Sequence, residues 1–138
     1  MKVPESSLVE VVTEASSRMS DPSYANGQVE RVMRAQPAIA QYVVAHQKEL
    51  AVDGVVTVLF HTCLILDSVV KATGRRPTRV SYNDLDAAAQ MVGNVEHLAK
   101  DEPALASYIA SNVGTEEGAT GVVAQTLLAQ VAKALLIA

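Results

Sequence analysis

The amino-acid sequence predicts an all-α protein, a bundle of about seven helices built from two tandem pseudo-symmetric repeats within one domain of 138 residues. Three observations lead to this prediction. A 19-residue segment recurs at a fixed distance, apolar residues repeat with helical spacing, and no stretch alternates apolar and polar residues as a half-buried strand does. The composition agrees, because Ala, Val and Leu supply most of the 49% apolar residues and only 4% are aromatic.

The recurring segment is the most informative feature of the sequence. Residues 27–45 (GQVERVMRAQPAIAQYVVA) align without a gap on residues 93–111 (GNVEHLAKDEPALASYIAS), at an offset of 66 positions. Seven pairs are identical: Gly27/Gly93, Val29/Val95, Glu30/Glu96, Pro37/Pro103, Ala38/Ala104, Ala40/Ala106 and Tyr42/Tyr108. Repeated units of this kind usually bury their apolar faces against each other.

The duplication therefore predicts one core shared by the two halves of the chain. We expect repeat 1 at about residues 7–72 and repeat 2 at about 73–138. Within them, residues 22–72 and 88–138 should superpose about a pseudo-twofold axis.

The first helix is expected at residues 8–19. Ser7 and Glu10 have the spacing of a capping box, in which each side chain bonds to the other residue's backbone N–H. Leu8 begins an apolar stripe that continues at helical spacing.

Prolines mark the next two helices. Asp21 followed by Pro22 predicts an N-cap with proline in the first turn, so the second helix should run over 22–36 with Met33 on its inner face. Pro37 cannot continue that helix without losing a hydrogen bond, and we expect a third helix to start there.

The fourth helix should begin after Asp53 as its N-cap and end at Gly74. In the second half, Ser81 and Asp84 form another capping-box pattern, which predicts one helix over 82–100.

Two further helices complete the second half. Pro103 should repeat the break at Pro37 and start a helix that runs to about Asn112. After a glycine-rich linker, the last helix should continue from about Val122 to the C-terminus.

His61, Cys63 and Asp67 form the sharpest polar group, because they lie within the most apolar segment of the chain. A buried imidazole or carboxylate has a perturbed pKa and can act as an acid, a base or a ligand. The structural interpretation, which we prefer, is that His61 bonds to a carbonyl or a Thr hydroxyl. Asp67 would then pair with Lys71, and Cys63 would pack as a small apolar residue.

The 66-residue offset supports the structural interpretation. It aligns His61 with Leu127 and Asp67 with Lys133, so the repeated fold does not require these polar groups. Their spacing matches none of the common metal-binding motifs, and we expect no metal and no cofactor.

Three other candidate pocket residues are Tyr42, Tyr108 and His46. The two tyrosines occupy equivalent repeat positions and are expected in the core with their hydroxyls bonded to buried partners, or alternatively lining a pocket. His46 occupies the position of Asn112, and both residue types can bond to carbonyls at the end of a helix.

The basic cluster of the chain lies on the connector between the repeats. Arg75, Arg76 and Arg79 are candidates for binding a phosphate or an acidic partner. We prefer a solvated cluster that offsets the negative C-terminal end of the fourth helix, because no glycine-rich phosphate loop accompanies it.

Charge and composition narrow the possible partners. The net charge is −4, and each half of the chain carries −2, so no basic domain is hidden by the average. We therefore expect neither a nucleic-acid nor a membrane partner. The N-terminus lacks the pattern of a signal peptide and the chain has one cysteine, which favours the cytoplasm.

Two classes of function stay open. The first is a non-enzymatic association module that forms a homodimer, favoured by the high apolar content and by the absence of a catalytic pattern. The second is a small-molecule-binding protein or enzyme with a pocket between the repeats, using His61, Asp67 and the two tyrosines. A solvent-reachable cavity at these residues favours the second class, and a dry core favours the first.

Overall fold

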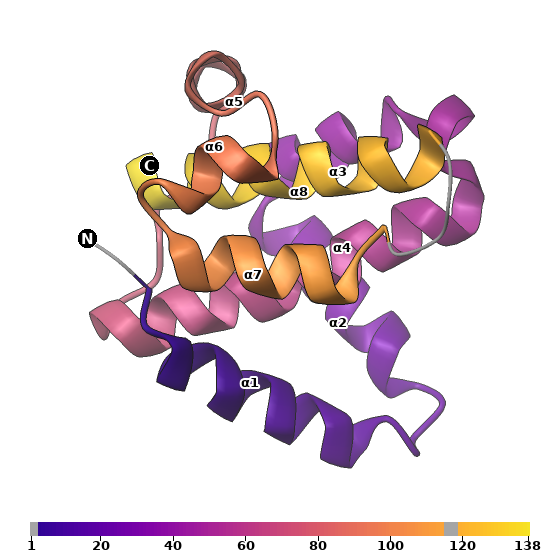
Figure 1. The fold of residues 1–138 in the computed structure, drawn as a ribbon. Coiled ribbons are helices and arrows are strands. Elements are labelled where there is room, and N and C mark those ends of the chain that lie inside the picture. Colours follow the sequence, from indigo (N-terminus) through magenta and orange to yellow (C-terminus); the bar gives the residue numbers. More distant parts are fainter. Residues whose placement is uncertain (1–2, 115–118) are drawn as a thin grey trace.

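The computed structural model describes residues 3–114 and 119–138, and within these residues the chain forms eight α-helices and no strand (Figure 1). The helices are α1 (Glu5–Arg18), α2 (Tyr24–Ala35), α3 (Pro37–Val44), α4 (Gln47–Thr73), α5 (Tyr82–Met91), α6 (Val95–Ala99), α7 (Pro103–Asn112) and α8 (Ala119–Ile137). The predicted all-α class is confirmed.

The two longest helices, α4 and α8, pack against each other at the centre of the protein, and the shorter helices surround them (Figure 1). α1, α2 and α3 lie against α4, whereas α5, α6 and α7 lie against α8. The two sets also contact each other away from the central pair, because α1 packs on α7 and α5 packs on α3.

Small side chains are buried in the central helix α8, which packs against α4. Ala129 and Ala132 of α8 are completely buried, as are the adjacent residues Leu128 and Val131. On α4, Ile65 is likewise inaccessible to solvent. A core of alanine, valine and leucine suits a protein that has no tryptophan and one phenylalanine.

The backbone has nearly the same conformation before Pro37 and before Pro103. Gln36 has φ −135° and ψ 68°, and Glu102 has φ −133° and ψ 70°. In both places the proline starts a helix, as predicted, because its missing N–H is not needed in the first turn.

Gln36 and Glu102 also make similar long-range hydrogen bonds, and each is only 3% exposed. The backbone N–H of Val80 donates to Gln36 Oε1 at 2.8 Å, and the N–H of Val3 donates to Glu102 Oε1 at 2.7 Å. These bonds fix the extended segments that lead into α5 and α1.

The second half contains two helices where one was predicted over 82–100. α5 ends at Met91 and α6 begins at Val95, which raises the number of helices from seven to eight in the described part of the chain. Asn94 causes the new start, because its side chain caps α6 by accepting from the N–H of His97 at 2.9 Å. The predicted capping box of Ser81 and Asp84 is present at the start of α5.

Three predicted helix starts are wrong by two or three residues. α8 begins at Ala119 and not at Val122, and residues 115–118 of the predicted linker before it lie outside the described part of the chain. α1 begins at Glu5 after the extended residue Pro4, and Ser7 lies inside the helix without capping it. α2 begins at Tyr24 because the Asp21 carboxylate accepts from the N–H and hydroxyl of Ser23, which closes a separate turn.

Other local expectations fail within α2 and α4. Met33 is 46% exposed and does not face the core. α4 begins at Gln47 and contains a kink at Ala51, with φ 59° and ψ 174°, so Asp53 is not its N-cap. The predicted stop is correct, because Gly74 ends α4 with φ 76°.

Two helical segments, Gln47–Thr73 and Thr120–Ile137, are long and apolar enough to cross a membrane by length and composition alone. Half of the most apolar window of each segment is buried within the fold. The central helices of a helical protein have the same properties, so this observation does not assign the chain to a membrane.

Candidate functional site

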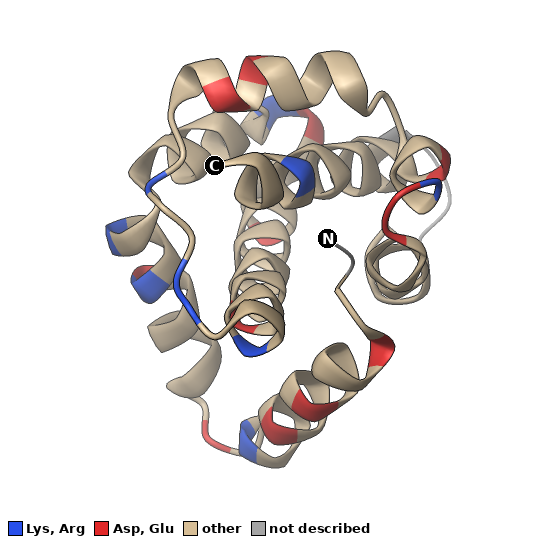
Figure 2. Ribbon diagram, turned by 90° about the vertical axis from the view of Figure 1, so that its left-hand side faces the viewer, with Lys and Arg blue, Asp and Glu red and all other residues tan. Residues whose placement is uncertain are grey.

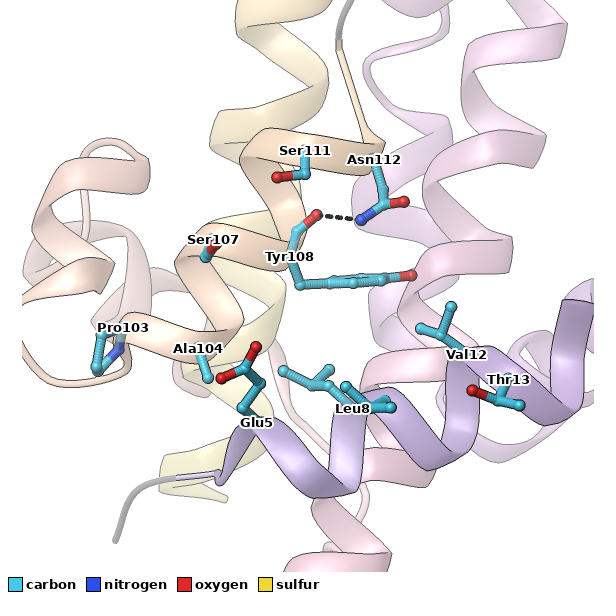
Figure 3. Close-up of a pocket in the computed structure, with 11 residues that line it drawn as sticks. Glu5, Leu8, Val12, Thr13, Pro103, Ala104, Ser107, Tyr108, Ser111 and Asn112 are labelled. Atoms are coloured by element: carbon cyan, nitrogen blue, oxygen red, sulfur yellow. Dashed lines mark hydrogen bonds between the residues drawn. The ribbon is translucent and has the colours of Figure 1, made fainter.

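A groove of about 550 Å³ lies between α1 and α7 (Figure 3). Leu8, Val9 and Val12 form its wall on α1, while Ala104 and Tyr108 belong to the opposite wall on α7. Val9 is 54% exposed at this surface. The groove is therefore an apolar, solvent-reachable feature on one side of the protein.

Six of the eleven residues that line this groove have polar side chains, including Asn112 and Tyr108, but five of the six are uncharged. Glu5 is the one charged residue in its lining, and it has no ion pair among the described residues. Ser107, Ser111 and Thr13 contribute small hydroxyl groups. Such a lining suits an apolar occupant better than an ionic one.

Tyr108 connects the groove to the core. Figure 3 shows its ring extending across the groove from α7. Its hydroxyl lies 2.5 Å from Nδ1 of His61 on α4, and the two ring centroids are 5.7 Å apart. The prediction that the Tyr108 hydroxyl has a buried hydrogen-bond partner is therefore confirmed. The prediction that His61 bonds to a carbonyl or a threonine hydroxyl is wrong, because its partner is Tyr108.

Burial keeps both members of this pair neutral. It lowers the pKa of His61 to about 4 and raises the pKa of Tyr108. At neutral pH the imidazole thus carries no charge and the phenol keeps its proton. The pair is thus a hydrogen bond between two neutral rings that pack against each other.

Cys63 and Asp67 lie on a different face of α4 from His61 and contact Arg31 of α2. The Arg31 guanidinium donates to both Asp67 oxygens at 2.8 and 2.7 Å and to Cys63 Sγ at 2.8 Å. The predicted pairing of Asp67 with Lys71 is wrong, because α2 brings the bidentate arginine to the carboxylate. Lys71 instead pairs with Glu10 of α1 at 3.1 Å.

The electrostatics of this cluster argue against a reactive thiol. Burial raises the pKa of Cys63 to about 12, an effect that the nearby Arg31 only partly offsets. The bidentate hydrogen bond to Asp67 raises the pKa of Arg31 further above its usual value. At neutral pH Cys63 is therefore a protonated thiol beside the bidentate ion pair of Arg31 and Asp67.

Tyr42 and His46 form a third, separate group. The Tyr42 hydroxyl donates to Gln130 Oε1 at 2.6 Å, and burial raises the pKa of this tyrosine. His46 Nδ1 lies 3.0 Å from the Tyr42 carbonyl, and Asn112 bonds to the Tyr108 carbonyl in the same way at 2.9 Å. The predicted role of both residues at helix ends is confirmed.

The six predicted pocket residues thus belong to three places instead of one. They are the His61–Tyr108 pair, the Cys63–Asp67 pair with Arg31, and the Tyr42–His46 pair. Every buried side-chain nitrogen and oxygen atom in residues 3–114 and 119–138 has a hydrogen-bond partner. No group of three or more potential metal ligands occurs in these residues.

The basic connector between α4 and α5 passes beside α2, on an edge of the protein where blue segments gather (Figure 2). Arg76 and Arg79 border a cavity of about 400 Å³ that also includes Arg31. Arg75 borders a different hollow, near the end of α8. Sequence reasoning missed Arg31, because 36 positions separate it from Asp67 and no local pattern connects the two residues.

No protein-family model matches this sequence, and the searches of curated proteins and of solved structures likewise returned no match.

Proposed function

We propose that the protein is a non-enzymatic helical association module that forms a homodimer through the groove between α1 and α7. We also keep the expectation that it works in the cytoplasm, without a nucleic-acid or membrane partner. The hydrogen bonds that His61 makes with Tyr108, and that Cys63 and Asp67 make with Arg31, support a structural role for these polar residues. The argument for association comes from the groove.

A pseudo-twofold relation between the two halves explains why the groove exists. In this relation the 66-residue offset matches α2 to α6, α3 to α7 and α4 to α8, whereas α1 is matched to α5 by its packing. The contacts agree with it, because α1 packs on α4 and α7 where α5 packs on α8 and α3. The matching backbone angles and hydrogen bonds of Gln36 and Glu102 support the same relation. We infer a duplicated unit in which the first helix of each half packs on the third helix of the other half: α1 on α7 and α5 on α3.

One difference between the halves carries the proposal. At the interface of α5 with α3, the Tyr82 hydroxyl donates to Gln41 Oε1 and bridges the two helices. At the interface of α1 with α7, the 66-residue offset aligns Ser107 with Gln41. Glu5 is matched to Tyr82 as the first residue of its helix and not by that offset, which aligns Tyr82 with Ser16. Glu5 and Ser107 line the groove without a hydrogen bond between them. The interface of α5 with α3 is therefore bridged by a hydrogen bond, whereas the corresponding interface of α1 with α7 contains the groove.

A second copy of the chain is the occupant that this surface fits. A twofold interface uses one patch on both partners, so the patch must hold both a projecting and a receiving element. Val9 projects from α1 beside the groove that receives it, which meets this condition. If α1 crosses its copy antiparallel, Glu5 at the helix start approaches Arg18 at the end of the second α1. Arg18 already pairs with Glu14 of its own helix at 2.9 Å, so in this arrangement the two carboxylates would share its guanidinium.

Sedimentation across a dilution series tests the dimer. We expect a dimer at micromolar concentration and a weakened dimer for Val9→Glu, which places a carboxylate in an apolar contact. Val122→Glu is the matched control, because Val122 is 66% exposed and lies on α8, outside the groove. A wild-type monomer at every concentration, or equal effects of the two substitutions, would refute the proposal.

A second experiment transplants the closed interface onto the open one. The variant Glu5→Tyr/Ser107→Gln introduces the residue pair found at the other interface. We expect it to remain folded, to fill the groove and to be monomeric. Circular dichroism monitors the fold, and a dimer of unchanged affinity would contradict the proposed interface.

The alternative function is a small-molecule-binding protein or enzyme with its site between the halves. Two solvent-reachable cavities at the candidate residues favour it by the criterion set out above: Tyr108 lines the groove and bonds to His61, and Asp67 lines the cavity beside Arg31. A wild-type monomer that binds an apolar fluorescent dye, with binding lost in Glu5→Tyr/Ser107→Gln, would support this alternative over the dimer.

A further inference from the structure

The cavity between α2, α4 and the connector before α5 is independent of the groove. It has a volume of about 400 Å³, within the range of small-ligand sites. Arg31, Arg76 and Arg79 border it, and Asp67 is the only acidic residue in the described lining. Three guanidinium groups and one carboxylate thus give the site a net charge of +2 in a chain whose net charge is −4.

The carboxylate does not neutralise the two connector arginines. Both oxygens of Asp67 accept from Arg31, at 2.8 and 2.7 Å. Among the described residues, neither Arg76 nor Arg79 takes part in an ion pair. The cavity therefore has two guanidinium groups available for an anion, next to a third that is held in place.

The connector is held in position by a buried side chain. Gln36 accepts from the N–H of Val80 at 2.8 Å and donates to the carbonyl of Thr78 at 3.3 Å, so it fixes the backbone on both sides of Arg79. At the other end of the connector, the N–H of Arg75 donates to the Thr73 hydroxyl at 3.3 Å. An arginine on a fixed backbone loses less conformational freedom when it binds a ligand.

The rest of the lining is apolar and includes Leu66, Val70 and Pro77. A bare inorganic ion would leave this part of the cavity without a contact. An anion that carries a small apolar group would cover it and gain hydrophobic stabilisation. A phosphate monoester has a charge of about −1.5 to −2 at neutral pH, which matches the charge of the site.

We propose that this cavity binds a small phosphate monoester with an apolar substituent, held by Arg76 and Arg79 beside the Arg31–Asp67 pair. Arginine is suited to this role because its planar guanidinium donates two parallel hydrogen bonds to phosphate oxygens. Covalent chemistry is not part of the proposal, since no reactive nucleophile faces the ligand in the described lining.

Isothermal titration calorimetry with phenyl phosphate at about 0.15 M ionic strength, where charges more than about 8 Å apart are largely screened, tests this site. The variant Arg79→Gln should weaken binding by about tenfold or more, and Arg76→Gln should act similarly, because each removes a charge-assisted hydrogen-bond donor. Arg75→Gln is the matched control, since it makes the same charge change on the same connector but lies outside the cavity. It should alter the affinity by less than about twofold, as expected for a screened charge outside the site.

The side chains of Arg75, Arg76 and Arg79 belong to exposed residues, so these substitutions should leave the fold intact. Absence of phenyl phosphate binding, or an equal loss for Arg75→Gln and Arg79→Gln, would overturn the proposal. Inorganic phosphate binding as tightly as phenyl phosphate would overturn the role of the apolar lining. Benzoate binding as tightly would overturn the preference for a phosphate.

Discussion

Replacing His61 with leucine provides a direct test of the structural role of the His61–Tyr108 pair. The change removes the partner of a phenol whose residue is only 8% exposed. A buried donor left without a partner costs about 1–3 kcal/mol, so His61→Leu should lower the free energy of unfolding by that amount at pH 7. The double variant His61→Leu/Tyr108→Phe removes both polar groups, and it should cost less than the sum of the single changes.

The pH dependence of stability gives this test a sharper form. The pKa of His61 is about 4 in the folded chain and 6.5 in the unfolded chain. Above pH 6.5 both states are neutral. As the pH falls from 6.5 towards 4, the unfolded chain binds the proton first, so stability is lost. Each pH unit costs at most about 1.4 kcal/mol, which gives about 2 kcal/mol between pH 7 and pH 5 and about 3 kcal/mol in total.

Urea unfolding followed by circular dichroism at pH 7 and pH 5 measures both effects. His61→Leu should be less stable than the wild type at pH 7. The difference should shrink by about 2 kcal/mol at pH 5, because only the wild type loses the contribution of a neutral histidine. Carboxylates titrate in both proteins and cancel from the comparison. If the two proteins lost the same stability between these pH values, the argument from His61 burial would be wrong.

Three backbone predictions follow from glycine and positive-φ positions. Ala51→Gly should stabilise the protein by about 1 kcal/mol in thermal unfolding, because φ 59° is unfavourable for any residue with a Cβ atom. Gly114→Ala should destabilise it by more than about 1 kcal/mol, since φ is +64° and a Cβ would clash with the Gly121 carbonyl oxygen. Gly27→Ala is the contrasting case: a Cβ added there would meet no atom within 4 Å, and the helix should gain about 0.5–1 kcal/mol. Opposite signs for Gly27 and Gly114 are required, and a stabilising Gly114→Ala would contradict the described backbone.

Local sequence signals were sufficient for much of the fold. The prolines at 37 and 103, the capping box before α5 and the glycine after α4 each act within one helical turn, so their effects are visible without tertiary structure. These signals predicted the helical class and several boundaries correctly.

The break between α5 and α6 shows where such signals fail. Gly27 and Gly93 are equivalent in the repeated segment, yet Gly27 lies inside α2 and Gly93 lies between two helices. The residue after each glycine makes the difference, because Asn94 caps a new helix whereas Gln28 bonds to the Tyr24 hydroxyl. Similarity of the aligned segments concealed this one substitution.

The candidate site was harder to predict, because the partners of its residues come from distant parts of the chain. Lys71 is the expected partner of Asp67 from helical spacing, but the packing of α2 on α4 supplies Arg31 instead. His61 and Asp67 are close in sequence and point to different neighbours. Periodicity identifies these residues as unusual, and only the arrangement of helices determines what they contact.

Tyr42 and Tyr108 contact polar residues at different positions on the two central helices, α8 and α4. Tyr42 reaches from α3 to Gln130 on α8, and Tyr108 reaches from α7 to His61 on α4. Each hydroxyl therefore crosses to the central helix of the other half. The 66-residue offset aligns Gln130 with Leu64, which lies about one helical turn from His61. A partner within one turn is enough for a side chain as long as tyrosine. Each tyrosine therefore has a polar partner on a central helix, although the two partners occupy different positions in the sequence alignment.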